Sequence, residues 1–175
     1  VLFADILTMV KRDGLKVLAV AMAALWLIVW LDVRHLGTTL AILSPLLAGM
    51  TWTLGAAWLA GIKANFMNLM TIPIVMGIGI DHGVHIYLRY KEEGRLSLPH
   101  VLTQTGPSIA VSSTTAMVGF AALLTADYRG LVSMGQMALL GLGLTFLSSV
   151  TLYPALLRWL EIRAGHTGSP HTKAK

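Results

Sequence analysis

The sequence has no cysteine and few charged residues. Among its 175 residues, Asp, Glu, Lys and Arg together make up only 12%. Without cysteine, the chain has no disulfides, thiolate nucleophiles or thiolate metal ligands. Soluble domains have about a quarter of their residues charged, whereas here 55% of residues are hydrophobic. The composition therefore predicts a membrane protein.

The few charges lie at the ends of apolar runs. The formal net charge is +5, but Lys and Arg occur singly or in small groups that flank apolar segments. This pattern is typical of contacts with anionic lipid headgroups and does not indicate a nucleic-acid partner. If the chain crosses the membrane five times, eight Lys and Arg residues lie on the side of the C-terminus and five on the other. This excess favours a cytoplasmic C-terminus.

Five apolar runs predict an all-α fold, a five-helix transmembrane bundle over residues 15–162. Such runs cross a hydrocarbon core of about 30 Å when the flanking residues reach the headgroups. The expected spans are residues 16–33, 37–61, 65–88, 107–126 and 131–160. Residues 1–14 are interpreted as a juxtamembrane remnant of a missing extracytoplasmic domain, and residues 163–175 as a basic, disordered tail.

Two of the connections carry local signals. After a tight turn at Gly61, Asn65 or Asn68 is expected to cap the third span. Residues 89–100 contain Lys, Glu, Arg and a proline, which predicts a polar connection outside the membrane. An interfacial helix is an alternative for this stretch.

Asp81 places a carboxyl group inside a segment that otherwise has the composition of a membrane span. The uncharged stretch 64–80 gives a helix of about 25 Å, which is too short to cross the hydrocarbon core. Continued to Leu88, the helix reaches about 37 Å and holds Asp81 within the bilayer. The alternative is that the helix ends at Ile80 and that Asp81 to Gly83 form a solvated cap.

The cost of a buried acid marks Asp81 as a functional candidate. A central Asp opposes membrane insertion by about 2.5 to 3.5 kcal/mol, and Phe, Leu, Ile or Val favours it by about 0.3 to 0.6 kcal/mol each. Ten such residues lie between Phe66 and Leu88, so the two contributions nearly cancel. An acid retained at this cost is expected to face the protein interior or water.

Helical periodicity separates two faces around Asp81. At 100° per residue, Gly77 and His85 share its face, while Gly79 and Gly83 form a Gly-x-x-x-Gly pair nearly opposite. Glycines spaced in this way allow close helix packing. We therefore expect packed helices to surround this segment on both sides.

The fourth span offers a polar surface that matches Asp81. Hydroxyl groups recur at helical spacing, and we expect this stripe to face Asp81 and to help hold water or a proton there. The alternative is that these groups make ordinary contacts between helices. The stripe consists of Ser108, Ser112, Thr115 and Gly119, with Thr114 beside it.

The predicted chemistry is protonation. A carboxyl group shielded from water disfavours its charged form, so it can gain and release a proton near neutral pH and bias a two-state bundle. His85, one turn on, is placed to bind Asp81 or pass a proton, whereas His82 points about 100° away. Both histidines have the alternative of a purely structural role. No third metal ligand lies at a diagnostic spacing, so no metal or other cofactor is expected besides the proton as coupling ion.

Several motifs follow one another in a fixed order along the chain. They are residues 46–49, Gly77-Ile78-Gly79-Ile80-Asp81, Gly83-Val84-His85, and residues 89–94, 113–120, 128–135 and 152–157. Over about residues 10 to 162, this series resembles the resistance-nodulation-division superfamily, in the branch of mycobacterial lipid exporters and hopanoid transporters.

The resemblance implies a transporter of two six-helix halves, each with a large extracytoplasmic domain between its first two helices. This chain resembles helices two to six of one half, the C-terminal one because a tail follows. Asp81 matches the proton-relay aspartate of the superfamily, and His82 stands where members often carry an aromatic residue. The implied partners are membrane lipids, a hydrophobic substrate, the other half and the extracytoplasmic domains. Assembly of several copies is left open.

Two function classes follow. The first is an exporter of lipids or other hydrophobic molecules, driven by the proton-motive force, in the inner membrane of a bacterium. The second is a lipid- or sterol-sensing membrane module that does not transport, because the same five-helix unit resembles the sterol-sensing domain. No nucleophile and base are placed together, so an enzyme is not expected.

Overall fold

The computed structural model describes residues 2–62, 65–93 and 98–165, and this part of the chain is almost entirely helical. The helices are α1 (Leu2–Val33), α2 (Leu36–Leu59), α3 (Phe66–Glu93), α4 (Leu98–Ala121), the short 3-10 helix η1 (Ala122–Thr125) and α5 (Arg129–Gly165). Each α-helix contains a stretch long and apolar enough to cross a membrane. The predicted all-α fold with five spans is confirmed.

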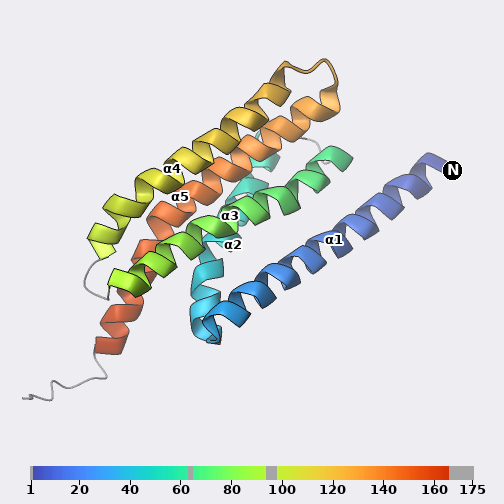
Figure 1. The fold of residues 1–175 in the computed structure, drawn as a ribbon. Coiled ribbons are helices and arrows are strands. Elements are labelled where there is room, and N and C mark those ends of the chain that lie inside the picture. Colours follow the sequence, from blue (N-terminus) through green and yellow to red (C-terminus); the bar gives the residue numbers. More distant parts are fainter. Residues whose placement is uncertain (1, 63–64, 94–97, 166–175) are drawn as a thin grey trace, which may run out of the picture.

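The helices form an up-and-down bundle with α5 near its centre. Successive helices run antiparallel, and α5 contacts α2, α3 and α4 (Figure 1). The first helix, α1, lies at the edge of the bundle and packs on α2 and α3. Its membrane-spanning stretch is mostly exposed, whereas α3 contacts all four of the other α-helices.

The helices α2 and α5 approach closely because small residues meet at their crossing. A Cβ atom added to Gly49 would lie 2.6 Å from Thr145 Cα, so only glycine fits there. Pro45 lacks the N–H that would bind the carbonyl oxygen of Ala41, and the Ser44 hydroxyl donates to that oxygen instead at 2.8 Å. Ser148 of α5 donates to the carbonyl oxygen of Pro45, also at 2.8 Å, which ties the two helices together.

The turn between α2 and α3 is formed by capping at both helix ends. Gly61 has a φ of +67°, and the N–H groups of Gly61 and Ile62 bind the carbonyls of Trp58 and Ala57. This is a Schellman cap, which requires a left-handed residue and favours glycine. Asn65 Oδ1 then accepts the N–H of Asn68 at 2.8 Å, so Asn65 is the residue that caps α3.

Several helices extend beyond the predicted spans. The first helix begins at Leu2, and α4 begins at Leu98 with Pro107 in its interior. Hydropathy marks the part of a helix that lies in hydrocarbon, but the helix itself continues into the polar zone, where its backbone bonds persist. The predicted polar connection and basic tail fall in part on residues 94–97 and 166–175, which lie outside the described residues. These two predictions therefore remain predictions there.

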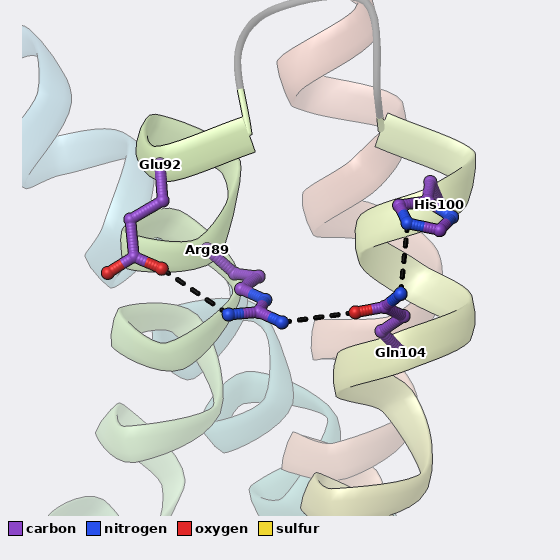
Figure 2. Close-up of polar contacts among 4 residues, drawn as sticks. All are labelled: Arg89, Glu92, His100 and Gln104. Carbon is purple, nitrogen blue, oxygen red and sulfur yellow. Dashed lines mark hydrogen bonds and ion pairs between the residues drawn. The ribbon is translucent and has the colours of Figure 1, made fainter.

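Residues 89–93 continue α3 and residues 98–100 begin α4, and polar side chains join the two helices here. Arg89 of α3 donates to Gln104 Oε1 of α4 at 3.0 Å and pairs with Glu92 at 3.5 Å. The amide of Gln104 lies 2.9 Å from His100 Nε2, so the four side chains form one row (Figure 2). These contacts join the C-terminal end of α3 to the N-terminal end of α4.

Candidate functional site

Asp81 lies in the interior of a continuous helix. The helix α3 begins at Phe66 and runs for about three more turns beyond Asp81, to Glu93. The alternative in which Asp81 to Gly83 form a solvated cap is therefore wrong. Within the apolar stretch Phe66–Glu92, Asp81 lies slightly nearer the Arg89 end.

The other helices of this chain do not enclose Asp81. Its side chain is exposed, and among the described residues no hydrogen bond or ion pair reaches its carboxylate. The expectation that packed helices surround it is thus wrong for this five-helix unit. The reason is geometric, because α3 turns its other faces to α1, α2, α4 and α5 and leaves one stripe open. The stripe comprises Met70, Ile74, Gly77, Asp81, His85 and Leu88.

The predicted hydroxyl stripe of α4 also lies on the surface of the bundle. Ser108, Ser112, Thr114 and Thr115 are all exposed. The contacts Arg89–Gln104 and His82–Ser113 set the antiparallel register, which puts Asp81 level with residues 112–114 along the helix pair. The hydroxyl of Thr115 donates to the carbonyl of Val111 in its own helix.

The glycines of α3 lie on two different faces of the helix, one packed against α2 and one open. A Cβ on Gly83 would lie 2.6 Å from the carbonyl oxygen of Ile42 in α2, and one on Gly79 would lie 3.0 Å from Leu46 Cδ1. These two glycines let α2 and α3 pack closely. A Cβ on Gly77 or Gly119 would meet no heavy atom within 4 Å, so the described residues do not pack there.

His82 points into the bundle, unlike its neighbour Asp81. Its side chain is only 3% exposed, and its ring lies edge-on to Phe146 of α5, with centroids 6.0 Å apart. Its Nε2 lies 2.8 Å from the hydroxyl oxygen of Ser113 in α4, which is 1% exposed. The helices α3, α4 and α5 therefore all contribute to the surroundings of this imidazole.

The contact with Ser113 bears on the tautomer of His82. We assign the Ser113 proton to the carbonyl oxygen of Ile109, 2.8 Å away, so that the Ser113 oxygen accepts from His82 Nε2–H; the reverse assignment would place the His82 proton on Nδ1. The imidazole then carries its proton on Nε2, and Nδ1 is a bare acceptor. That nitrogen is buried and has no hydrogen-bond partner among the described residues.

The remaining candidates lie apart from this buried pair. His85 is exposed on the Asp81 side of α3. Among the described residues, no three His, Asp or Glu side chains are grouped as a metal site would require. Sequence reasoning did not single out Ser113, because it places Ser112 on the polar stripe and adjacent residues differ by 100° around a helix. The contact with His82 identifies the inward-facing serine.

Comparisons with known proteins agree with this architecture. The sequence model of the MMPL family matches residues 1–173. The chain is 31% identical to a putative membrane protein of Methanocaldococcus jannaschii, over 66% of this chain and 31% of that protein. It is 27% identical to the hopanoid transporter HpnN of Rhodopseudomonas palustris, over 86% of this chain and 18% of the transporter.

A third relative comes from a mycobacterium. The sulfolipid-1 exporter MmpL8 of Mycobacterium tuberculosis is 30% identical, over 58% of this chain and 10% of the exporter. The chain thus spans about a third or less of the length of the relatives it matches. Because the family model covers nearly every residue, the chain belongs to the MMPL family of integral membrane proteins.

Proposed function

We propose that this chain is part of a proton-driven exporter of lipids or other hydrophobic molecules, and that Asp81 carries the proton. Membership of the MMPL family supports this function. So do the names of two relatives, a hopanoid transporter and a sulfolipid-1 exporter. The observation that carries the proposal is an unpaired carboxyl group in the interior of a membrane-spanning helix.

The position of Asp81 favours contact with another protein surface or with water. A charged Asp facing lipid near the bilayer centre costs about 2.5 to 3.5 kcal/mol or more, and such residues almost always face a bundle interior or water. The helices of this chain leave Asp81 exposed, together with the apolar Met70, Ile74 and Leu88. The other transmembrane half of the transporter is the partner that we propose for this stripe.

Small residues fit the proposed docking. Gly77 shares the stripe with Asp81, and its Cα faces open space on this chain. Gly119 of α4 is open in the same way. Glycine on an exposed helix face lets a partner helix approach its backbone closely. In this arrangement the exposed hydroxyls of Ser108, Ser112 and Thr115, which share one face of α4, would supply hydrogen bonds to water or to the partner, whereas Thr114 lies on another face of α4.

Protonation would couple the gradient to movement at this junction. A charged Asp81 needs water or a donor across the interface, whereas a neutral one can pack against an apolar partner. Uptake and release of a proton would therefore change the contact between the two halves, in a membrane protein with its C-terminus in the cytoplasm of a bacterium. His85 is placed to assist on the same side of α3, and His82 lies about 100° away, on a buried face.

The experiment compares the intact protein with its Asp81→Asn variant in vesicles that hold a pH gradient. Asn keeps the size and polarity of Asp but cannot take up a proton in this pH range. We expect the Asp81→Asn protein to fold normally but to move no substrate. The matched control is Asp127→Asn, in the exposed turn between η1 and α5, which should transport normally. Normal transport by Asp81→Asn would overturn the relay role and favour a lipid-sensing module.

A further inference from the structure

Two buried side-chain polar atoms among the described residues lack a hydrogen-bond partner, one on α3 and one on α5. One is Nδ1 of His82, and the other is the hydroxyl oxygen of Tyr153. Tyr153 is 0% exposed and His82 is 3% exposed, so bulk solvent reaches neither. A buried polar group without a partner costs free energy, and native proteins usually satisfy such groups with ordered water.

The two atoms lie along one seam between parallel helices. His82 of α3 is level with Phe146 of α5, against which its ring packs. Tyr153 comes seven residues after Phe146, which is about 10 Å farther along α5 and on the same face of that helix. Tyr87 and Tyr90 of α3 pack against the buried core that includes Tyr153. The seam therefore leads from His82 toward the end of the bundle where α3 ends.

A third polar side chain lies between the level of His82 and the level of Tyr153 along α5. Ser149 is 0% exposed and lies three residues after Phe146 and four before Tyr153, which places it on the same stripe of α5. Its hydroxyl donates to the carbonyl of Thr145 at 2.9 Å, so its oxygen keeps an acceptor position. The seam thus offers acceptors at His82 and Ser149 and a donor at Tyr153.

We propose that water occupies this seam and joins His82 to Tyr153 through hydrogen bonds, giving protons a route toward the end where α3 ends. Water both donates and accepts, so it satisfies the bare nitrogen of His82 and the hydroxyl of Tyr153. A proton taken up at one end of such a chain is matched by a proton released at the other. The water site stands on the geometry alone, and its role as a route rests on the proposed function.

The surroundings of His82 leave the route few other proton carriers. On α3, the titratable side chains nearest to it along the chain are Asp81 and His85. Ser113 of α4 and Phe146 of α5, the side chains that contact its ring, do not titrate. Tyr153 is therefore the titratable group that α5 contributes along this seam.

Water in the seam is tested by hydroxyl-radical footprinting of the intact protein in lipid nanodiscs. X-ray radiolysis generates radicals from water in place, so a buried tyrosine is labelled only when water lies beside it. Tyr128, which is 61% exposed in the turn before α5, is the reference. We expect Tyr153 to be labelled at a rate of the same order as Tyr128. If Tyr153 stays unlabelled while Tyr128 reacts, the water site is overturned.

The proton route is tested by Tyr153→Phe, which removes only the hydroxyl. Transport driven by a pH gradient is expected to slow by about fivefold, the equivalent of one hydrogen bond of about 1 kcal/mol. Thermal unfolding of the same sample checks that folding is retained. The matched control, Tyr128→Phe, removes an exposed hydroxyl and should transport at the wild-type rate. Unslowed transport by a folded Tyr153→Phe protein overturns the route.

These tests separate the seam from the proposed function. If Asp81→Asn abolishes transport but Tyr153 is not labelled, the seam is wrong and the role of Asp81 stands. If Tyr153 is labelled and Asp81→Asn transports normally, the water site stands, and the proton route falls together with the role of Asp81.

Discussion

At the residue scale, Asp81 and His82 are adjacent in sequence but lie in different surroundings. Asp81 is on the open stripe of α3, and His82 is buried against Ser113 and Phe146. Because adjacent residues differ by 100° around a helix, a single turn of α3 presents a carboxyl group outward and an imidazole inward. The backbone of α3 thus links the open stripe, which we propose as a docking surface, to the bundle interior.

Replacing Ser113 with alanine tests the tautomer of His82. The Ser113→Ala variant leaves a buried Nε2–H without an acceptor, which is expected to destabilise the protein by about 1 to 3 kcal/mol. Its effect should appear in thermal unfolding and in the ¹⁵N NMR shifts of the imidazole, which report the tautomer. Thr115→Ala is the control, because its hydroxyl bonds only within α4 and is exposed. Unchanged imidazole shifts in Ser113→Ala would contradict the assigned tautomer.

At the element scale, sequence reasoning predicts the number of helices and the close-packing face of α3. The pair Gly79 and Gly83 is recognisable because its spacing of four places both residues on one face. Helix ends are less predictable, since Pro107 resembles a helix start but lies nine residues inside α4. Hydropathy measures contact with lipid, and the backbone bonds that define a helix extend beyond it.

The packing role of Gly83 is tested by substitution with alanine. In Gly83→Ala, the new methyl group would collide with the carbonyl oxygen of Ile42, so α2 and α3 must separate. We expect a loss of about 1 to 3 kcal/mol in the free energy of unfolding. Gly55→Ala is the control, because its Cβ meets nothing within 4 Å and alanine favours a helix. Equal stability of the two variants, measured by denaturant unfolding, would contradict the close approach.

At the scale of the whole molecule, sequence alone does not reveal which face of α3 lacks a neighbour. Periodicity places Gly77, Asp81 and His85 together, but the order of helices around the bundle depends on packing between distant segments. The crossing of α2 and α5 at Gly49 and Thr145 is such a contact, and the α4 face is set by Ser113 in the same way. The open stripe of α3 emerges only from the assembled bundle.

If the other transmembrane half docks on the open stripe of α3, a bulky residue at Gly77 should disturb the contact and lower transport. In Gly77→Leu, the side chain has room within this chain, so folding of the five helices should be retained. It would instead hold a partner helix away from Asp81 and lower transport. Transport assays together with cross-linking between the halves measure both effects. Gly55→Leu, at an open position of α2, is the control; if both variants transport equally well, Gly77 is not at the interface.

The most direct test of a proton-carrying Asp81 is infrared difference spectroscopy of the intact protein in lipid as the pH is changed. We predict a band from a protonated carboxyl group that shifts in D₂O, is present in the wild type and in Asp127→Asn, and is missing in Asp81→Asn. An unchanged band in Asp81→Asn would show that another group takes up the proton and that Asp81 is not the carrier.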